Sequence, residues 1–135
     1  EDVNARYYAS STSISGSLAT IVWTTKDFDS HGSMSSGLYT VSTPGKYLIN
    51  TGLALAGTFA LNSTNIIEIQ KNSTAVTNVT KYSGGIVTAE TIQTSDIISC
   101  IAGDVIRIQA SSGATGPSIV SSNTKNFISI SRAGN

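Results

Sequence analysis

Short runs in which apolar and polar residues alternate fill this chain, and turn-forming residues separate them. In residues 66–72, Ile67 and Ile69 fall on one side of the alternation, while Glu68 and Gln70 fall on the other. Such alternation is typical of a β-strand that buries one face. No stretch keeps the periodicity of an amphipathic helix, and β-branched residues are frequent throughout. The chain is therefore predicted to be all-β.

Turn signals rich in Gly, Ser, Asn and Pro divide the chain into nine predicted strands. They cover residues 5–10, 17–24, 37–41, 46–56, 65–71, 75–82, 90–101, 105–110 and 125–132. Pro44 and Gly45 mark one turn, because proline fixes φ and glycine tolerates a positive φ. Strands of this length and spacing predict a β-sandwich or barrel that forms a single domain over residues 1–135.

The predicted strand at residues 46–56 is apolar on both faces. One face carries Tyr47 and Ile49, and the other carries Leu48 and Asn50, with further leucines beyond them. The core of the domain is predicted to contain Tyr47, Ile49, Ile67, Ile69, Ile106 and Ile108. The second face needs a partner outside that core, and in one small domain the simplest partner is another copy of the chain.

Charged residues make up only 12% of the chain, and the net charge is zero. Nucleic acids and anionic membranes bind basic patches, so neither is expected as a partner. No apolar run is long enough to insert in a membrane, and no signal peptide is recognisable. Cys100 is the single cysteine, which excludes an intrachain disulfide, and we expect a buried thiol there.

The residues needed for catalysis are sparse. His31 is the only histidine, it lies in a Gly/Ser-rich loop, and no Gly-x-Ser-x-Gly motif occurs. An enzyme is therefore not expected, and neither is a cofactor. Asp27 and Asp29 are the one pair that could flank a sugar or, with Ser30, offer oxygen ligands to Ca²⁺. Ordinary polar positions are the favoured interpretation of this pair, so no metal site is predicted.

Several landmarks occur in a characteristic order along the chain. They are ARYYASS at residues 5–11, Phe28-Asp29, YTV at 39–41, PGKY at 44–47, IQKN at 69–72, IAGDVI at 101–106 and FISISR at 127–132. Together they resemble the globular head of complement component 1q and the tumour-necrosis-factor superfamily. The variant found at the C-terminal ends of phage tail fibres and bacterial surface fibres is the most similar.

This resemblance implies a jelly roll of two antiparallel sheets that assembles as a homotrimer around a threefold axis. It also implies that the chain is the C-terminal part of a longer fibrous protein, placed on a virion tail fibre or another extracellular surface. We expect the trimer interface to include Tyr7, Leu48, Asn50 and Phe127.

The function predicted from this resemblance is binding of a host-cell surface receptor, with a saccharide favoured over a protein. Sugars stack on aromatic rings beside amides and hydroxyls, so the candidate ligand-binding residues are Trp23, Tyr39, Tyr82 and Asn123. The Gly-rich loop at residues 111–117 is a further candidate recognition surface. Two alternatives stay open: a purely structural trimerisation cap, and a secreted complement-like or cytokine-like ligand. Sugar on the sequons at Asn62, Asn72 or Asn78 would support the latter.

Overall fold

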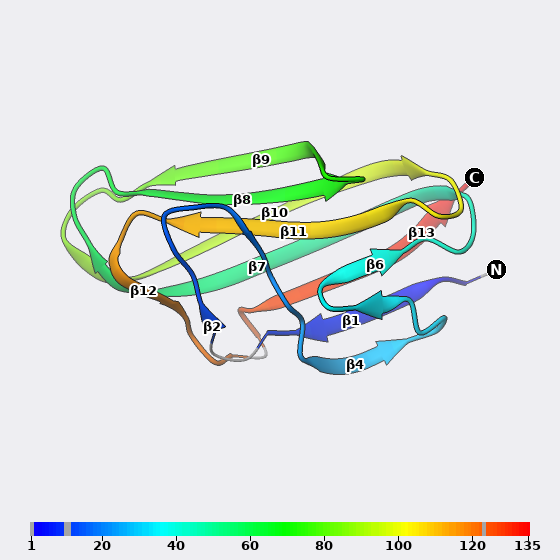
Figure 1. Ribbon diagram of the computed structural model, residues 1–135, viewed down its shortest axis with the longest axis horizontal. Coiled ribbons are helices and arrows are strands. Elements are labelled where there is room, and N and C mark those ends of the chain that lie inside the picture. Colours follow the sequence, from blue (N-terminus) through cyan, green and yellow to red (C-terminus); the bar gives the residue numbers. More distant parts are fainter. Residues whose placement is uncertain (1, 10–11, 123) are drawn as a thin grey trace.

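Two antiparallel β-sheets pack face to face in the computed structural model, which describes residues 2–9, 12–122 and 124–135 (Figure 1). The first sheet contains, in order, β2 (Thr12–Ser13), β12 (Thr115–Ile119), β7 (Gly45–Phe59), β13 (Phe127–Gly134), β1 (Asn4–Tyr8) and β4 (Thr25–Asp29), with β10 (Val87–Cys100) on the other edge of β7. The second contains β5 (Met34–Ser35), β6 (Leu38–Thr40), β11 (Val105–Ser112), β8 (Thr64–Lys71) and β9 (Thr74–Tyr82), with β3 (Ala19–Thr20) against β11.

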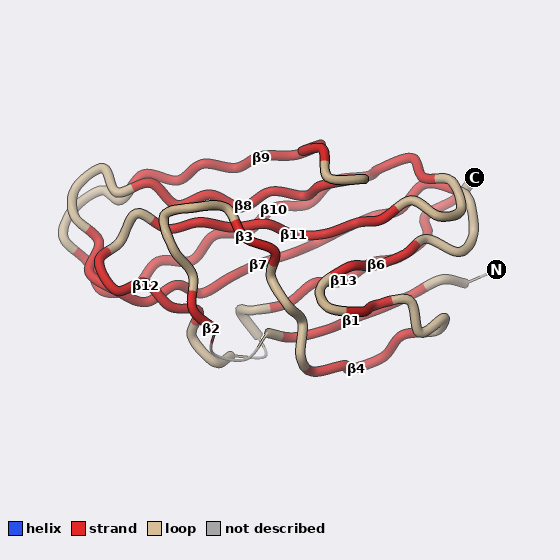
Figure 2. Tube along the Cα trace, viewed as in Figure 1, coloured by secondary structure: helices blue, strands red, loops and turns tan. Residues whose placement is uncertain are grey.

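Strand β7 organises the first sheet because it is long enough to pair with several neighbours. One edge pairs with β10 along almost its whole length. The opposite edge pairs first with β13, from Lys46 to Gly52, and then with β12, from Leu55 to Thr58. The described residues contain only strands, turns and loops (Figure 2), and none forms a helix that could cross a membrane.

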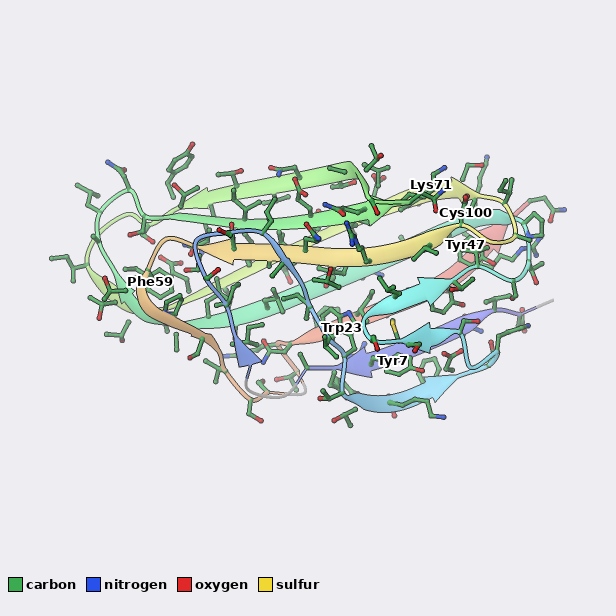
Figure 3. All side chains as sticks on the ribbon, in the orientation of Figure 1. Tyr7, Trp23, Tyr47, Phe59, Lys71 and Cys100 are labelled. Carbon is green, nitrogen blue, oxygen red and sulfur yellow. The ribbon has the colours of Figure 1, made fainter. Side chains whose placement is uncertain are left out.

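The core follows the predicted alternation. Of the predicted core residues, all six are fully buried: Tyr47, Ile49, Ile67, Ile69, Ile106 and Ile108. Burying one such side chain stabilises the fold by roughly 1.5–3 kcal/mol. The core side chains labelled in Figure 3, from Tyr47 to Phe59, extend along the length of the sandwich. Cys100 is also buried as predicted, and burial and the charge of Asp104 raise the pKa of its thiol.

Side-chain contacts link the two sheets where β9 and β10 approach each other. Lys81 on β9 forms an ion pair with Glu90 on β10 at 2.7 Å, and Thr77 donates a hydrogen bond to Asp96. Lys71 on β8 donates to the backbone carbonyl of Ser99 at 3.0 Å. These contacts engage the charged side chains of Lys71, Lys81, Glu90 and Asp96. Few charged groups near β9 and β10 therefore remain available to bind a ligand.

Some strand boundaries differ from the predicted ones. Within the predicted strand 17–24 only β3, at Ala19–Thr20, pairs with a neighbour, and the structure adds β4 at Thr25–Asp29. The Gly-rich segment expected as a recognition loop contributes most of β12, which pairs with β7 and β2. Pro117 is tolerated there because the register of β12 against β7 shifts between Thr115 and Ser118.

Strand β1 begins and β13 ends at one end of the sandwich, on the right of Figure 1. The connections β7–β8 and β9–β10 lie at the opposite end, on the left. Backbone hydrogen bonds tie these two connections together: Asn62 N–H donates to the Ser83 carbonyl at 2.8 Å, and Ser83 N–H donates to the Ser63 carbonyl at 3.0 Å. We call the left end the distal end.

Candidate functional site

The surface of β1, β13, β7 and β10 that faces away from the core is the candidate functional site, and we call it the outer face. Strand pairing places its residues in rows: Ile97, Leu48, Ser131 and Asn4 in one; Ser95, Asn50, Ser129 and Arg6 in the next; Gln93, Gly52, Phe127 and Tyr8 in the third. Arg6 is the only charged side chain in these rows. Ile97 is 58% exposed beside Leu48, so an apolar pair faces outward.

Arg6 is held between two aromatic rings on this face. Its guanidinium carbon lies 5.0 Å from the centre of the Phe127 ring and 5.2 Å from the centre of the Tyr8 ring. Its Nε donates a hydrogen bond to the Tyr8 hydroxyl at 3.2 Å. Cation–π contacts of this kind fix a guanidinium in one orientation.

We call Arg6 with the rings of Phe127 and Tyr8 the clamp. A cavity of about 550 Å³ opens beside it. Its lining is polar and, apart from Arg6, uncharged, with side chains of Asn50, Gln93, Ser95 and Ser129 around Phe127. A smaller cavity of about 250 Å³ lies beyond Phe127 and Gln93, which line both. Gly52 fits beneath the aromatic ring, because an added Cβ would lie 3.1 Å from Cε1 of Phe127.

The structure places three of the four predicted interface residues, Leu48, Asn50 and Phe127, on the outer face. The fourth, Tyr7, points the other way and is only 7% exposed. Its hydroxyl donates to Asp29 at 2.9 Å, and burial together with this carboxylate raises the pKa of Tyr7 to about 12. Tyr7 therefore belongs to the core, and its neighbour Tyr8 occupies the outer face.

Asp29 organises the loop that follows β4. Its carboxylate accepts hydrogen bonds from the backbone N–H groups of His31, Gly32, Ser33 and Met34, at 2.9 to 3.3 Å, in addition to the Tyr7 hydroxyl. Partial burial raises the pKa of Asp29, but these hydrogen bonds outweigh burial and lower it overall. The carboxylate thus has a structural role in this loop.

The weak metal candidates do not converge. Asp27 accepts a hydrogen bond from the Tyr8 hydroxyl at 3.1 Å, whereas the oxygens of Asp29 are occupied by the loop. Within the described ranges, no three His, Cys, Asp or Glu side chains form a group that could hold a metal ion.

The predicted ligand-binding aromatics separate into two sets. Trp23 is 5% exposed and Tyr39 is fully buried, so neither can act as a stacking platform and that prediction is wrong for both. Burial and the nearby Asp29 raise the pKa of Tyr39 to about 12. Tyr82, in contrast, is 63% exposed. Asn123 lies outside the described residues.

Tyr82 is part of an exposed apolar cluster at the distal end, which we call the distal patch. The patch consists of Leu61, Tyr82, Ile86 and Val87. Ile86 is 82% exposed and Leu61 is 62% exposed, so these aliphatic side chains project into solvent. The sequence prediction named only Tyr82, because it considered aromatic residues and not the aliphatic residues of the adjoining turns.

No protein-family model matches this chain, and no curated protein matches it. Solved structures match over nearly the whole length. The globular domain of zebrafish complement 1qA protein has a TM-score of 0.68 at 13% identity, covering 96% of this chain and 93% of that chain. Murine APRIL at pH 8.0 has a TM-score of 0.70 at 9% identity, covering 98% and 99% respectively. At these identities the similarity shows a shared fold, and the predicted jelly roll is confirmed.

Proposed function

We propose that this complement-1q-like jelly roll acts as a non-catalytic, homotrimeric recognition head that binds a receptor on a cell surface. The observation that carries the proposal is the outer face, where the exposed Ile97 lies beside Leu48 and the central rows hold one charged side chain, Arg6. Few charges and exposed aliphatic residues are typical of surfaces that other protein chains cover.

A second copy of this chain is the partner that we propose for the outer face. The resemblance implies a trimer, and the proposed contact residues are Leu48, Asn50 and Phe127, to which the structure adds Ile97 and Arg6. Arginine and large aromatic side chains are frequent energetic centres of protein interfaces. In this arrangement the copies meet through the sheet that contains β1 and β13.

The positions of the strands fit a head carried by a fibre. Strand β1 begins at the end opposite the distal patch (Figure 1), so a preceding stalk would leave the distal end free. We propose an extracellular location for the head, at the tip of a phage tail fibre or a similar surface fibre. Three copies would present three receptor sites together, and this avidity makes weak individual contacts sufficient.

Two classes of receptor fit the distal patch. A saccharide can stack on the ring of Tyr82, which is exposed. A protein is the second candidate, because Leu61 and Ile86 are aliphatic and highly exposed, and the two connections that carry them are hydrogen-bonded to each other. In either case the receptor surface is expected to be uncharged, since Lys81 and Glu90 nearby neutralise each other at 2.7 Å.

Glycan-array binding and cell adhesion by the isolated head test this assignment. We expect a saccharide receptor to lose about ten-fold or more in affinity with Tyr82→Ala, by loss of a stacking ring. A protein receptor is expected to depend mainly on Ile86, with a similar loss in Ile86→Ser. Ile101→Ser is the matched control, because Ile101 is 68% exposed in the β10–β11 turn, away from the patch.

Binding that survives both patch variants would place the receptor site elsewhere. A trimer that binds neither a saccharide nor cells would instead support the purely structural cap.

A further inference from the structure

We propose that the cavity beside Arg6 is a binding site for an oxyanion, that is, for a carboxylate, sulfate or phosphate group. The inference rests on the proposed function, because it names a ligand for the face on which the copies are proposed to meet.

The guanidinium of Arg6 is positioned before any ligand binds. The rings of Phe127 and Tyr8 lie at 5.0 and 5.2 Å from its central carbon, and the Tyr8 hydroxyl accepts a hydrogen bond from Nε. A side chain that is already ordered loses less conformational entropy when a ligand arrives. This cost is usually large for arginine, so the clamp favours binding.

The terminal nitrogens of Arg6 are available to a ligand. Among the described residues, its recorded polar contacts are the Tyr8 hydroxyl and Asp27, and both involve Nε. The Asp27 carboxylate is 4.0 Å from Nε, beyond hydrogen-bond distance, and accepts from the Tyr8 hydroxyl. A planar guanidinium whose terminal N–H groups are free binds the paired oxygens of an oxyanion in a bidentate manner.

The cavity lining supplies further hydrogen-bond donors and no negative charge. Side-chain amides of Asn50 and Gln93, and hydroxyls of Ser95 and Ser129, surround a volume of about 550 Å³. Amides and hydroxyls can donate to the oxygens that the guanidinium does not reach. Asp27 is the charged group nearest to the guanidinium, but it does not line the cavity.

A neighbouring copy has little negative charge to offer Arg6. Most carboxylates in the described part of the chain already have partners: Asp29 in its loop, Glu68 with Gln70 and Asn78, Glu90 with Lys81, Asp96 with Thr77, and Asp104 with Asn72. Burying the outer face would therefore leave the guanidinium with the Asp27 carboxylate, 4.0 Å from Nε, as its nearest counter-charge and its terminal nitrogens without an acceptor, which is unfavourable. An oxyanion from solution removes this penalty.

Two sources could supply such a group. One is an acidic saccharide, whose carboxylate would bind Arg6 while its ring lies against Phe127. The other is a free inorganic anion. The shared chemistry is the oxyanion, and the probes below distinguish the sources.

Calorimetry and thermal unfolding of the chain test the proposal with sodium sulfate, sodium phosphate and sodium glucuronate, each compared with sodium chloride at equal ionic strength. We expect at least one oxyanion to bind and to raise the midpoint of unfolding more than chloride does. Glucuronate binding that the neutral methyl ester of glucuronate lacks assigns an acidic saccharide. Tighter binding of sulfate or phosphate assigns an inorganic anion.

The variants identify the site. Arg6→Gln is expected to abolish binding, and Arg6→Lys to weaken it about ten-fold or more, because lysine keeps the charge and loses the bidentate geometry. Arg107→Gln is the control, since Arg107 lies on the other sheet and its Nε donates to Gln70; it should bind as the unchanged chain does. Circular dichroism confirms that each variant folds.

Responses equal to those in chloride, or undiminished binding by folded Arg6→Gln, would overturn the proposal. Light scattering on the same samples separates this failure from that of the proposed function. A monomer that binds sulfate through Arg6 contradicts the trimer alone, whereas a trimer indifferent to all three anions contradicts the anion site alone.

Discussion

Replacing Leu48 by aspartate is expected to convert the proposed trimer into monomers while the jelly roll stays folded. Leu48 lies on the outer face and pairs across the sheet with the exposed Ile97. A carboxylate at this position would be buried in every copy of an assembled trimer, and desolvating each one costs several kcal/mol. Light scattering should therefore give the mass of one chain, with the β-sheet circular dichroism spectrum unchanged.

Val76→Asp is the matched control for this substitution. Val76 is an exposed aliphatic residue on β9, in the other sheet. The Val76→Asp variant should have the same assembly mass as the unchanged chain. A folded Leu48→Asp variant that remains trimeric would remove the outer face from the proposed interface.

Replacing the next residue, Ile49, by alanine is expected to lower the stability of the fold and to leave the assembly state unchanged. Ile49 is fully buried between the sheets, so the substitution removes core contacts and leaves a cavity. The free energy of unfolding should fall by about 2–5 kcal/mol, as measured by denaturant unfolding, while the folded protein keeps its assembly state. A loss of assembly without a loss of stability would contradict the assignment of the two faces of β7.

The alternation along the strands correctly predicted six core residues, which come from both sheets: Tyr47, Ile49, Ile67, Ile69, Ile106 and Ile108. The same alternation also explains why Trp23 and Tyr39, which were predicted to bind a ligand, are buried instead. Ile21 and Trp23 are buried while the intervening Val22 is 43% exposed, so Trp23 follows the alternation of its segment. The same rule buries Tyr39 with Val41, on either side of an exposed Thr40. Choosing residues by aromatic identity alone ignored this pattern.

The assignment of Tyr7 failed for a related reason. Ala5, Tyr7 and Ala9 are buried, whereas Arg6 and Tyr8 are partly exposed. The position of Arg6 could therefore have indicated which tyrosine lies outside.

Other features depend on contacts that no local pattern encodes. Asp29 accepts hydrogen bonds from four backbone N–H groups only because the following loop folds back over its carboxylate. The clamp on Arg6 joins β1 to β13, whose residues are far apart in the sequence. In β12, Gly116 and Pro117 suggested a loop, but pairing with β7 overrode that local preference.

The mass of the unmodified chain in solution tests the central claim most directly. Multi-angle light scattering across a range of concentrations should give a value close to three times 14.0 kDa, because the outer face is proposed to be covered by neighbouring copies. A stable species of 14.0 kDa at all concentrations would contradict the trimeric head and, with it, the avidity on which weak receptor binding depends.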